Sequence, residues 1–469
     1  MPAITNISPA TAPATASSLL LTVTGTGFAP GATLQLNGGP RTATVTSSTQ
    51  MQATLAAADL QVAQSLAVTV VNPAPGGGVS NAVGLTVVAD KIVFSSNRAL
   101  SGADTAGPRS NVWLMDSDGF NQTPLTRLTN ADSAGAVRSP DGSKIAFLSN
   151  RALNGIDALN TNGTRNLWVM NADGSSPAPV TSYTFALSGG AIAAGSIAWA
   201  PDGSRIAYAA PAAVDGTDAA NPATNLWVVK TDGTARTALT GLTAASTASS
   251  PAWSPDGTTI IFSSDRNIDG SNSAASDTNV WMAKADGSAV APLTKTTAHL
   301  GTLVILHLQP RFSPDGRRIL FTSNRTLDGS DAITTGIFNV WAMNADGSSL
   351  TALTRLTGVS SGPAAWSPDG TQIAFASNRG VDGSDSTHPS SNIWIMAADG
   401  SAPTILTALS TATAGGPVWA PAGRHIRFSS NRALNGADTT IATNNIWQID
   451  SDRSNEVPLT RLAVASVTQ

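Results

Sequence analysis

Seven loops of the chain share a short oxygen-rich motif, and these residue types could bind a hard cation. Each loop contains Gly-x-Asp or Gly-x-Asn, and another Asp or Asn usually precedes the glycine. Ca²⁺ takes about six to eight oxygen ligands from carboxylates and carbonyls, commonly on a glycine-containing loop. Calcium is therefore a candidate cofactor. The candidate ligands are Asp104, Asp157, Asp215, Asp218, Asp269, Asn272, Asp328, Asp331, Asp382, Asp385 and Asp438.

The same residues have an interpretation without metal, and it is the favoured one. Asp and Asn side chains form Asx turns with their own backbone. An arginine precedes six of the seven loops and could pair with the carboxylate. None of the loops matches a known calcium motif such as the EF-hand. The arginines are Arg98, Arg151, Arg266, Arg325, Arg379 and Arg432.

Catalytic chemistry has little support, so we predict a protein that is not an enzyme and has no catalytic residues. Cysteine is absent, which excludes thiolate nucleophiles and disulfides. The segment Gly358–Gly362 fits Gly-x-Ser-x-Gly, but a nucleophile elbow needs a strand-turn-helix context, and no helix is readable here. The four histidines, His299, His307, His388 and His425, are scattered through the repeats described next.

The elements that position these loops follow from a repeat. Asn-(Val/Leu/Ile)-Trp, usually followed by Asp-Gly, occurs seven times at spacings of 55, 59, 54, 60, 53 and 53 residues. A period in this range, built from short strands and turns, is typical of a β-propeller. The repeat predicts seven blades of four antiparallel strands, with the tryptophans in the core. The marker residues are Trp113, Trp168, Trp227, Trp281, Trp341, Trp394 and Trp447.

Two turns define each unit. Pro-Asp-Gly joins the first two strands, as at Trp253–Gly257, and Asp-Gly joins the last two. These units resemble the PD40 repeats of TolB-type propellers over residues 90–469. TolB is six-bladed by its family pattern, whereas this chain has seven units. Some copies depart from the pattern at Arg138, Phe312, Ala422 and Arg453.

The first unit lacks its first strand. It begins at Lys91–Phe94 with no Ser-Pro-Asp-Gly strand before it, and an unpaired edge would be left. We expect the chain end, Leu462–Val467, to supply the missing strand and close the ring. The alternative donor is Leu85–Val88, and donation between molecules is a further one.

Residues 1–89 lack the repeat and predict a separate antiparallel β-sandwich. Alternating segments occur at Ala3–Ser8, Leu19–Val23, Thr33–Leu36, Thr42–Val45, Met51–Thr54, Leu66–Val71 and Ala82–Val88. The runs Ile4–Pro9, Val23–Gly31, Val70–Pro73 and Ser80–Val83 resemble an IPT/TIG immunoglobulin-like domain. Some relatives of this fold bind DNA, but the segment carries almost no charge, so we expect a spacer or docking module.

Two connections between repeats are longer than the others and are candidate partner-binding sites, on the same face as the Gly-x-Asp loops. One, Thr181–Ser196, contains Tyr183 and Phe185. The other, Thr296–Gln309, contains His299, Leu303, Ile305 and His307. Loops that deviate from a rigid scaffold are favoured places for recognition. The alternative is that Leu303–Leu308 extends an inner strand.

Composition narrows the functional class. Charged residues make up 12% of the 469, the net charge is −4, and neither a basic block nor an apolar run of 18 residues occurs. We therefore expect no nucleic-acid partner and no membrane span. Met1–Ile4 does not read as a signal peptide, although a leader could have been removed.

We predict a secreted or cell-surface protein, periplasmic or extracellular, with an immunoglobulin-like β-sandwich at 1–89 and a seven-bladed propeller at 90–469. Its expected role is non-catalytic binding of a protein partner on the loop face. The alternatives are calcium-assisted carbohydrate binding and a structural role in an extracellular assembly.

Overall fold

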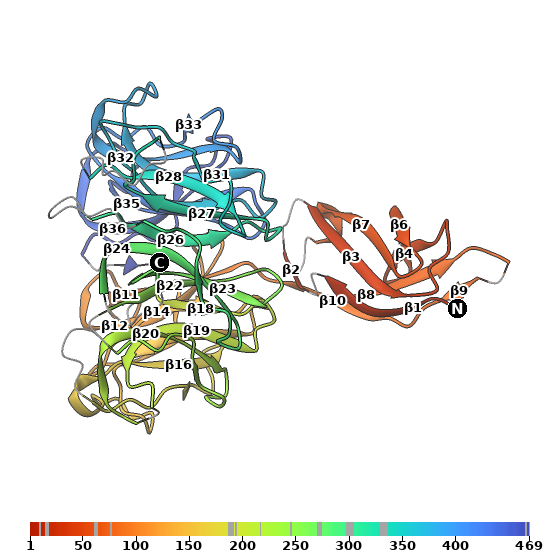
Figure 1. The fold of residues 1–469 in the computed structure, drawn as a ribbon, viewed down its shortest axis with the longest axis horizontal. Helices are drawn as coiled ribbons and strands as arrows, with labels where there is room; N and C mark the ends of the chain where they lie inside the picture. Colours follow the sequence, from red (N-terminus) through yellow and green to blue (C-terminus); the bar gives the residue numbers. More distant parts are fainter. Residues whose placement is uncertain are drawn as a thin grey trace. The chain divides into compact units, whose positions relative to one another are not determined.

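The computed structural model describes residues 1–8, 11–14, 18–60, 64–75, 77–185, 192, 195–215, 217–243, 246–269, 274–296, 304–328, 336–464 and 467–468. The chain is nearly all-β and divides into two compact units (Figure 1). One comprises Met1–Lys91 with Ala420–Arg424, and the other Ile92–Trp419 with His425–Gln469. The described part has two 3-10 helices, η1 (Ala57–Asp59) and η2 (Thr161–Gly163). None of its helices is long and apolar enough to span a membrane.

The first unit is a β-sandwich of two sheets. One sheet has the strand order β1-β3-β7-β6, and the other has β2-β10-β8-β4-β5 with β9 paired to β8. Every segment predicted from the sequence contains a strand, and β2, β5 and β9 are additional short ones. The bounds are β1 (Ala3–Ser8), β2 (Thr11–Pro13), β3 (Ser18–Thr26), β4 (Thr33–Leu36), β5 (Gly39–Arg41), β6 (Ala43–Ser47), β7 (Gln50–Ala56), β8 (Gln64–Asn72), β9 (Gly78–Val79) and β10 (Val83–Val88).

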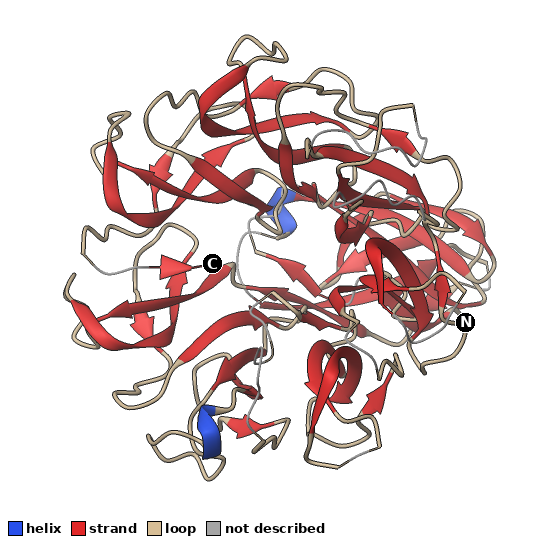
Figure 2. Cartoon of the chain, turned by 60° about the vertical axis from the view of Figure 1, so that its left-hand side comes forward, coloured by secondary structure: helices blue, strands red, loops and turns tan. Residues whose placement is uncertain are grey.

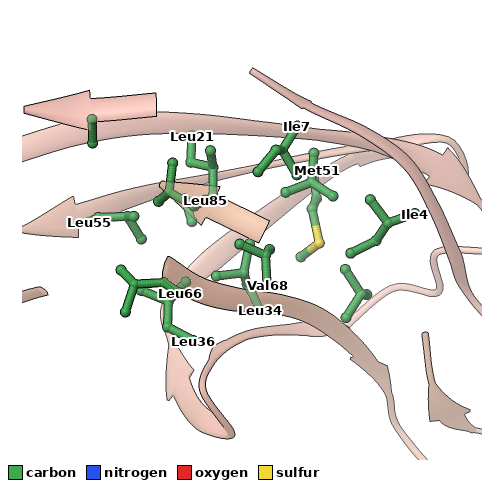
Figure 3. Close-up of a cluster of buried hydrophobic side chains, with 14 of the residues drawn as sticks. Ile4, Ile7, Leu21, Leu34, Leu36, Met51, Leu55, Leu66, Val68 and Leu85 are labelled. Carbon is green, nitrogen blue, oxygen red and sulfur yellow. The ribbon is translucent and has the colours of Figure 1, made fainter. Parts of the chain in front are cut away.

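Alternate residues of these strands form the core of the sandwich. Met51 and Leu55 of β7 are buried, as are Leu66 and Val68 of β8. Figure 3 shows these side chains among others that converge between the sheets. The two-residue period of a strand places every second side chain inside, which is why the alternation in the sequence predicted the sheets correctly.

The corner after β3 depends on a glycine. A Cβ on Gly25 would lie 2.0 Å from the carbonyl oxygen of Ala3 and 2.7 Å from the Phe28 ring. Any side chain would therefore collide with β1. Phe28 is buried, as expected for a residue that closes the end of the sandwich.

In the described residues the second unit consists of seven four-stranded sheets, the blades, arranged in a ring (Figure 2). The predicted seven-bladed propeller is confirmed. Blades 1 to 3 are β11 (Lys91–Arg98), β12 (Ala106–Asp116), β13 (Thr123–Pro124); β14 (Ser133–Arg138), β15 (Lys144–Ser149), β16 (Asn166–Asn171), β17 (Ala178–Pro179); and β18 (Ile197–Trp199), β19 (Arg205–Ala212), β20 (Ala220–Lys230), β21 (Thr237–Ala238). Blades 4 and 5 are β22 (Ala248–Trp253), β23 (Thr259–Arg266), β24 (Ala274–Lys284), β25 (Ala291–Pro292); and β26 (His307–Phe312), β27 (Arg318–Ser323), β28 (Asn339–Asn344), β29 (Thr351–Ala352). Blades 6 and 7 are β30 (Ser361–Trp366), β31 (Gln372–Arg379), β32 (Thr387–Ala397), β33 (Thr404–Ile405); and β34 (Ala414–Trp419), β35 (His425–Arg432), β36 (Thr440–Asp450), β37 (Val457–Pro458).

The chain end completes blade 1, as predicted. Strand β38 (Val467–Thr468) pairs antiparallel with β11, with Ser96 opposite Val467. The alternative donor, β10, pairs with β8 and β2 in the sandwich instead. The fourth strand of blade 1 therefore comes from the far end of the chain, and this closes the ring.

The core of each blade is an aromatic pair. The Trp of the third strand stands opposite an aromatic residue of the second, as Trp281 does opposite Phe262 in blade 4. All eleven tryptophans are buried, which confirms their assignment to the core. Trp253 of the first strand also donates from Nε1 to the carbonyl oxygen of Ala198 in the preceding blade, at 3.0 Å.

The turns explain which departures from the repeat the fold tolerates. Gly257 of a Pro-Asp-Gly turn has a φ of 68°, and Gly400 of an Asp-Gly hairpin has a φ of 87°. Both lie in the left-handed region that favours glycine. Arg453 stands where the other hairpins have glycine and keeps the same backbone conformation, with a φ of 73°.

Candidate functional site on the loop face

The loop face is the side of the propeller that carries the seven Gly-x-Asp loops and the connections between blades. A buried hydrogen-bond network anchors each connection. In blade 7, Asn445 Oδ1 accepts from Thr460 Oγ1 at 2.9 Å and from the Leu462 N–H at 2.8 Å, while its Nδ2 donates to the Leu462 carbonyl at 2.8 Å. All seven blades repeat the Asn–Thr pair. The others are Asn111–Thr126, Asn166–Thr181, Asn225–Thr240, Asn279–Thr294, Asn339–Thr354 and Asn392–Thr407.

This network was not predicted, although its signal is in the sequence. The Asn before each Trp and the Thr of each Leu-Thr were noted only as markers of the repeat. Their fixed separation of about one hairpin puts the Asn on the third strand and the Thr just beyond the fourth. A buried amide must find hydrogen-bond partners. The network matters for function because it fixes where each connection leaves its blade.

The Asp of the Gly-x-Asp motif holds the adjacent connection. Asp157 accepts hydrogen bonds from the backbone N–H groups of Thr129, Asn130 and Ala131 at 2.8, 3.0 and 3.2 Å. These three residues connect blade 1 to blade 2. The loop and the connection therefore lie on one face, as expected. Equivalent bonds are made by Asp104 to Ala463, Asp218 to Thr184, Asp385 to Thr357 and Asp438 to Ser410.

These hydrogen bonds keep the carboxylates ionised. Burial alone would raise the pKa of the Asp438 carboxyl, but hydrogen bonds from Ser410, Ala412 and Thr411 lower it to about 2. The pKa values of Asp157 and Asp385 are lowered in the same way. A carboxylate that accepts several N–H groups favours its charged form.

The first acidic residue makes a local turn. Asp215 Oδ1 accepts from the backbone N–H of Thr217 at 2.9 Å, and Asp382 Oδ1 accepts from that of Ser384 at 2.9 Å. These are the expected Asx turns. The pKa of each carboxyl is lowered, mainly by the hydroxyl of the same Thr or Ser.

In blades 1, 6 and 7 the arginine before the loop contacts groups other than the loop carboxylate. The guanidinium of Arg98 lies over the Trp113 ring, 4.9 Å from its centroid, and donates to the Gly102 carbonyl oxygen. Arg379 makes the same two contacts with Trp394 and Gly383. Arg432 makes them with Trp447 and Gly436. Desolvation lowers the pKa of Arg98, and the charge of Asp104 raises it. The charge of Asp104 thus acts on Arg98 at longer range than an ion pair, while the Trp113 ring is a direct cation–π partner. Arg432 also forms an ion pair, with Glu456.

Calcium binding at these loops stays a prediction. Within the described part of the chain, no three His, Asp or Glu side chains converge as metal ligands would. Asn272 and Asp331 lie outside the described residues. Asp269 and Asp328 are exposed, and each has another interaction partner. The carboxylates of the other loops already accept hydrogen bonds from the protein.

The two long connections contribute less surface than expected. Tyr183 is buried and shares a 2.9 Å hydrogen bond with the Tyr208 hydroxyl, while Phe185 packs edge-on against it and is half-buried. Ile305 and His307 are fully buried. The partner-binding assignment of Tyr183, Ile305 and His307 was therefore wrong, because their side chains fill gaps between blades. His299 and Leu303 lie outside the described residues.

His307 belongs to an inner strand, as the alternative interpretation held. It is the first residue of β26, where its Nδ1 lies 2.7 Å from Ser323 Oγ. Burial, with a smaller effect from the charge of Arg325, lowers the pKa of His307 to about 3. The imidazole is therefore neutral at physiological pH.

The loop face instead exposes aliphatic side chains that the sequence analysis passed over. Ile156 is 61% exposed and Leu159 is 52% exposed, both in the loop of blade 2. Val214, Val381 and Val464 are also exposed, in the loops of blades 3 and 6 and in the connection from blade 7 to blade 1. The sequence analysis used the polar residues of the Gly-x-Asp motif. It did not use the variable positions next to the aspartates, where aliphatic residues such as Ile156 occur.

Comparison with known proteins agrees with the two-part architecture. Residues 2–87 match the family model described as the IPT/TIG domain. The first unit is an IPT/TIG domain. The only charged side chains of residues 2–87, Arg41 and Asp59, form an ion pair with each other.

The propeller is similar to several solved structures of low sequence identity. TolB from Acinetobacter baumannii is 17% identical, with 81% of this chain and 82% of that chain covered and a TM-score of 0.40. An oligogalacturonate lyase from Vibrio parahaemolyticus is 14% identical, with 80% and 86% covered and a TM-score of 0.48. A prolyl endopeptidase is 12% identical, with 81% of this chain and 50% of that chain covered and a TM-score of 0.52. Of these three, the prolyl endopeptidase has a TM-score above 0.5 and shows a shared fold, and its identity of 12% says nothing about activity.

Proposed function

We propose that this protein is a non-catalytic scaffold of the bacterial envelope or extracellular space that binds a protein partner on the loop face of its propeller. The supporting observation is the set of exposed aliphatic side chains on that face, above all Ile156 and Leu159. Single exposed aliphatics are ordinary, but Ile156 and Leu159 stand three residues apart on one loop, and neighbouring exposed aliphatics favour an interaction surface.

The rigidity of the face strengthens the proposal. The loop of blade 2 is tied to the next connection by Asn162, whose Nδ2 donates to the Thr184 carbonyl at 3.0 Å. Thr184 in turn donates from its backbone N–H to Asp218 of blade 3 at 3.2 Å. Ile156 and Leu159 thus stand on a loop that is connected through hydrogen bonds to the neighbouring blade. A preorganised surface loses less conformational entropy when it binds.

The absence of enzyme activity remains part of the proposal. Ser360 of the Gly-x-Ser-x-Gly segment precedes β30, and its Oγ accepts from the backbone N–H of Phe338 at 3.1 Å. This serine is used as a structural acceptor between blades 5 and 6. The IPT/TIG domain, with its self-paired charges, serves in this proposal as a spacer or docking module.

The test is affinity capture from envelope fractions, with partners quantified by mass spectrometry. The wild-type protein is compared with the double variant Ile156→Asp, Leu159→Asp and with Val457→Asp, which places one such charge on an exposed aliphatic of the outer strand β37. We expect one partner to be retained by wild type and Val457→Asp and lost by the double variant. Equal retention by all three proteins would refute the loop-face assignment. A glycan ligand removed by EGTA would instead support carbohydrate binding.

A further inference from the structure

The seven blades provide an internal comparison, because equivalent positions face the same surroundings. The residue before the last residue of the first strand is aliphatic in blades 2, 3, 4, 6 and 7, where it is Val137, Ala198, Ala252, Ala365 and Val418. In blade 5 it is Arg311. The repeat gives no structural reason for a charge at this position.

These positions lie at the hub, which is the ring of first strands around the propeller axis. The first strands of neighbouring blades contact each other, as β22 does with β26 and β30 with β34. Figure 2 shows the blades arranged around this centre. Because each first strand has a blade on either side, an exposed side chain on it faces the axis. Arg311, Val137 and Val418 are all exposed.

Arg311 has no hydrogen-bond or ion-pair partner for its side chain among the described residues, although other arginines of the propeller stack on tryptophans or donate to carbonyls. Desolvation by the surrounding protein lowers the pKa of Arg311, although solvent still reaches the side chain. An arginine remains charged under these conditions. A guanidinium among aliphatic groups gains most from an anion that enters and pairs with it.

Gln309 is a second unusual residue on the same strand. It occupies the β-bulge of β26 between Leu308 and Arg311 with a φ of 54°, in the left-handed region. The equivalent bulge residues of blades 2 and 7 are glycines, Gly135 and Gly416, with φ values of 62° and 61°, and that of blade 4 is Ser250, with a φ of 53°. Glycine adopts this conformation without strain, whereas glutamine does not. The exposed Gln309 side chain is also without a partner among the described residues.

We propose that Arg311 and Gln309 form an anion-binding site on the propeller axis that takes a carboxylate, from a small organic acid or from the C terminus of a peptide. A guanidinium pairs with both oxygens of a planar carboxylate, and the amide supplies one further donor. The site goes beyond the loop-face function and does not depend on it.

The charge of the surroundings favours a carboxylate over a phosphate dianion. The turns at the ends of five hub strands carry aspartates, namely Asp141, Asp202, Asp256, Asp315 and Asp369. Hydrogen bonds lower the pKa of each, so these carboxyls are ionised. One guanidinium balances a single negative charge, so a carboxylate needs no further cation at the site, whereas a phosphate dianion does.

The test compares the full chain with three variants. Arg311→Ala reproduces the residue of blades 3, 4 and 6, and Gln309→Gly reproduces that of blades 2 and 7, so both suit the fold. Arg317→Ala removes an exposed arginine from the same blade and is the charge-matched control. The probes are acetate, succinate, inorganic phosphate and trialanine with a free or an amidated C terminus, titrated calorimetrically at constant ionic strength.

We expect wild type and Arg317→Ala to bind a carboxylate probe, and Arg311→Ala to bind it at least about tenfold more weakly. Gln309→Gly should bind more weakly while its Tm rises, because strain is relieved. Binding of trialanine but not of its amide would assign the site to a chain end, whereas binding of succinate or acetate alone would assign it to a small acid. The proposal is overturned if no carboxylate binds, if phosphate binds best, or if Arg311→Ala binds like wild type.

Carboxylate binding at the hub and partner capture on the loop face can be tested separately. Arg311→Ala leaves the loop face intact, and the variant with Asp at positions 156 and 159 leaves the hub intact. Failure of carboxylate binding with normal partner capture would remove only the axial site.

Discussion

Asp104 accepts a hydrogen bond from the backbone N–H of Ala463 at 2.7 Å, across a sequence separation of 359 residues. The same junction contains the Gln122 side chain, whose Nε2 donates to the Leu459 carbonyl at 3.0 Å. Ring closure in this propeller thus joins blade 1 to the end of the chain through polar contacts as well as through strand β38.

The closing strand can be tested by one core substitution. Val467 is 6% exposed and belongs to one buried hydrophobic cluster with Ile92, Phe94 and Trp113 of blade 1. We expect Val467→Ala to lower the free energy of unfolding by about 1–3 kcal/mol, because it leaves a cavity beneath β11. Val464→Ala, at a position 62% exposed, is the control. Urea unfolding of both variants is the measurement, and equal effects would contradict closure by β38.

The Asn–Thr network predicts a sharp contrast between two adjacent asparagines. Asn445→Ala removes the acceptor of Thr460 and Leu462 and leaves buried groups unsatisfied, at about 1–3 kcal/mol for each group. Asn444→Ala, next to it on β36 and exposed, should change stability by less than about 0.5 kcal/mol. Chemical denaturation measures both. Similar losses for the two variants would show that the network carries little of the stability.

His307 makes stability depend on pH. Its pKa is about 3 in the folded protein, below the ordinary value of 6.5. As pH falls, the unfolded chain therefore binds a proton at this histidine before the folded protein does. The neutral form of His307 contributes fully to the free energy of unfolding above about pH 6.5, and this contribution is lost progressively towards pH 3. The slope reaches at most about 1.4 kcal/mol per pH unit. Urea unfolding of wild type and His307→Gln between pH 7 and pH 4.5 measures it, and an unchanged slope in the variant would exclude His307 as its source.

The carboxylates of the loop face should protect backbone amides from exchange. Asp438→Asn removes the charge that receives the N–H groups of Ser410, Thr411 and Ala412. We expect faster hydrogen exchange confined to these amides and a stability loss of about 1 kcal/mol. Asp399→Asn, in an exposed hairpin, should leave exchange at residues 410–412 unchanged. Unaltered exchange in Asp438→Asn would mean that the connection is ordered by other contacts.

A thermal melt in EGTA and then in millimolar calcium tests the metal prediction directly. Asp157, Asp385 and Asp438 already accept backbone N–H groups, so calcium would have to displace these bonds. We expect Tm to stay constant. A saturable rise would show that the folded protein binds the ion, because a ligand specific to the folded state stabilises it.

Much of the fold could be read from the sequence because the repeat encodes it locally. The alternation of Met51–Leu55, the Pro-Asp-Gly turn at Gly257 and the spacing of the tryptophans each act within one hairpin. Strand period and turn conformation are local properties of the backbone. Seven copies of one unit predict that the blades form a ring. The missing strand of blade 1 was readable for the same reason, since one copy of the pattern was incomplete.

The candidate sites were predicted less well because burial is decided by neighbouring blades. Tyr183 and His307 look like recognition residues in sequence, yet adjacent strands cover both. The opposite holds for Ile156 and Arg311, whose exposure depends on what the other blades leave open. Sequence by itself determined the strands, the turns and the number of blades, which arise from short-range physics. The tertiary structure alone decided which side chains reach solvent, since that depends on packing between segments far apart in the chain.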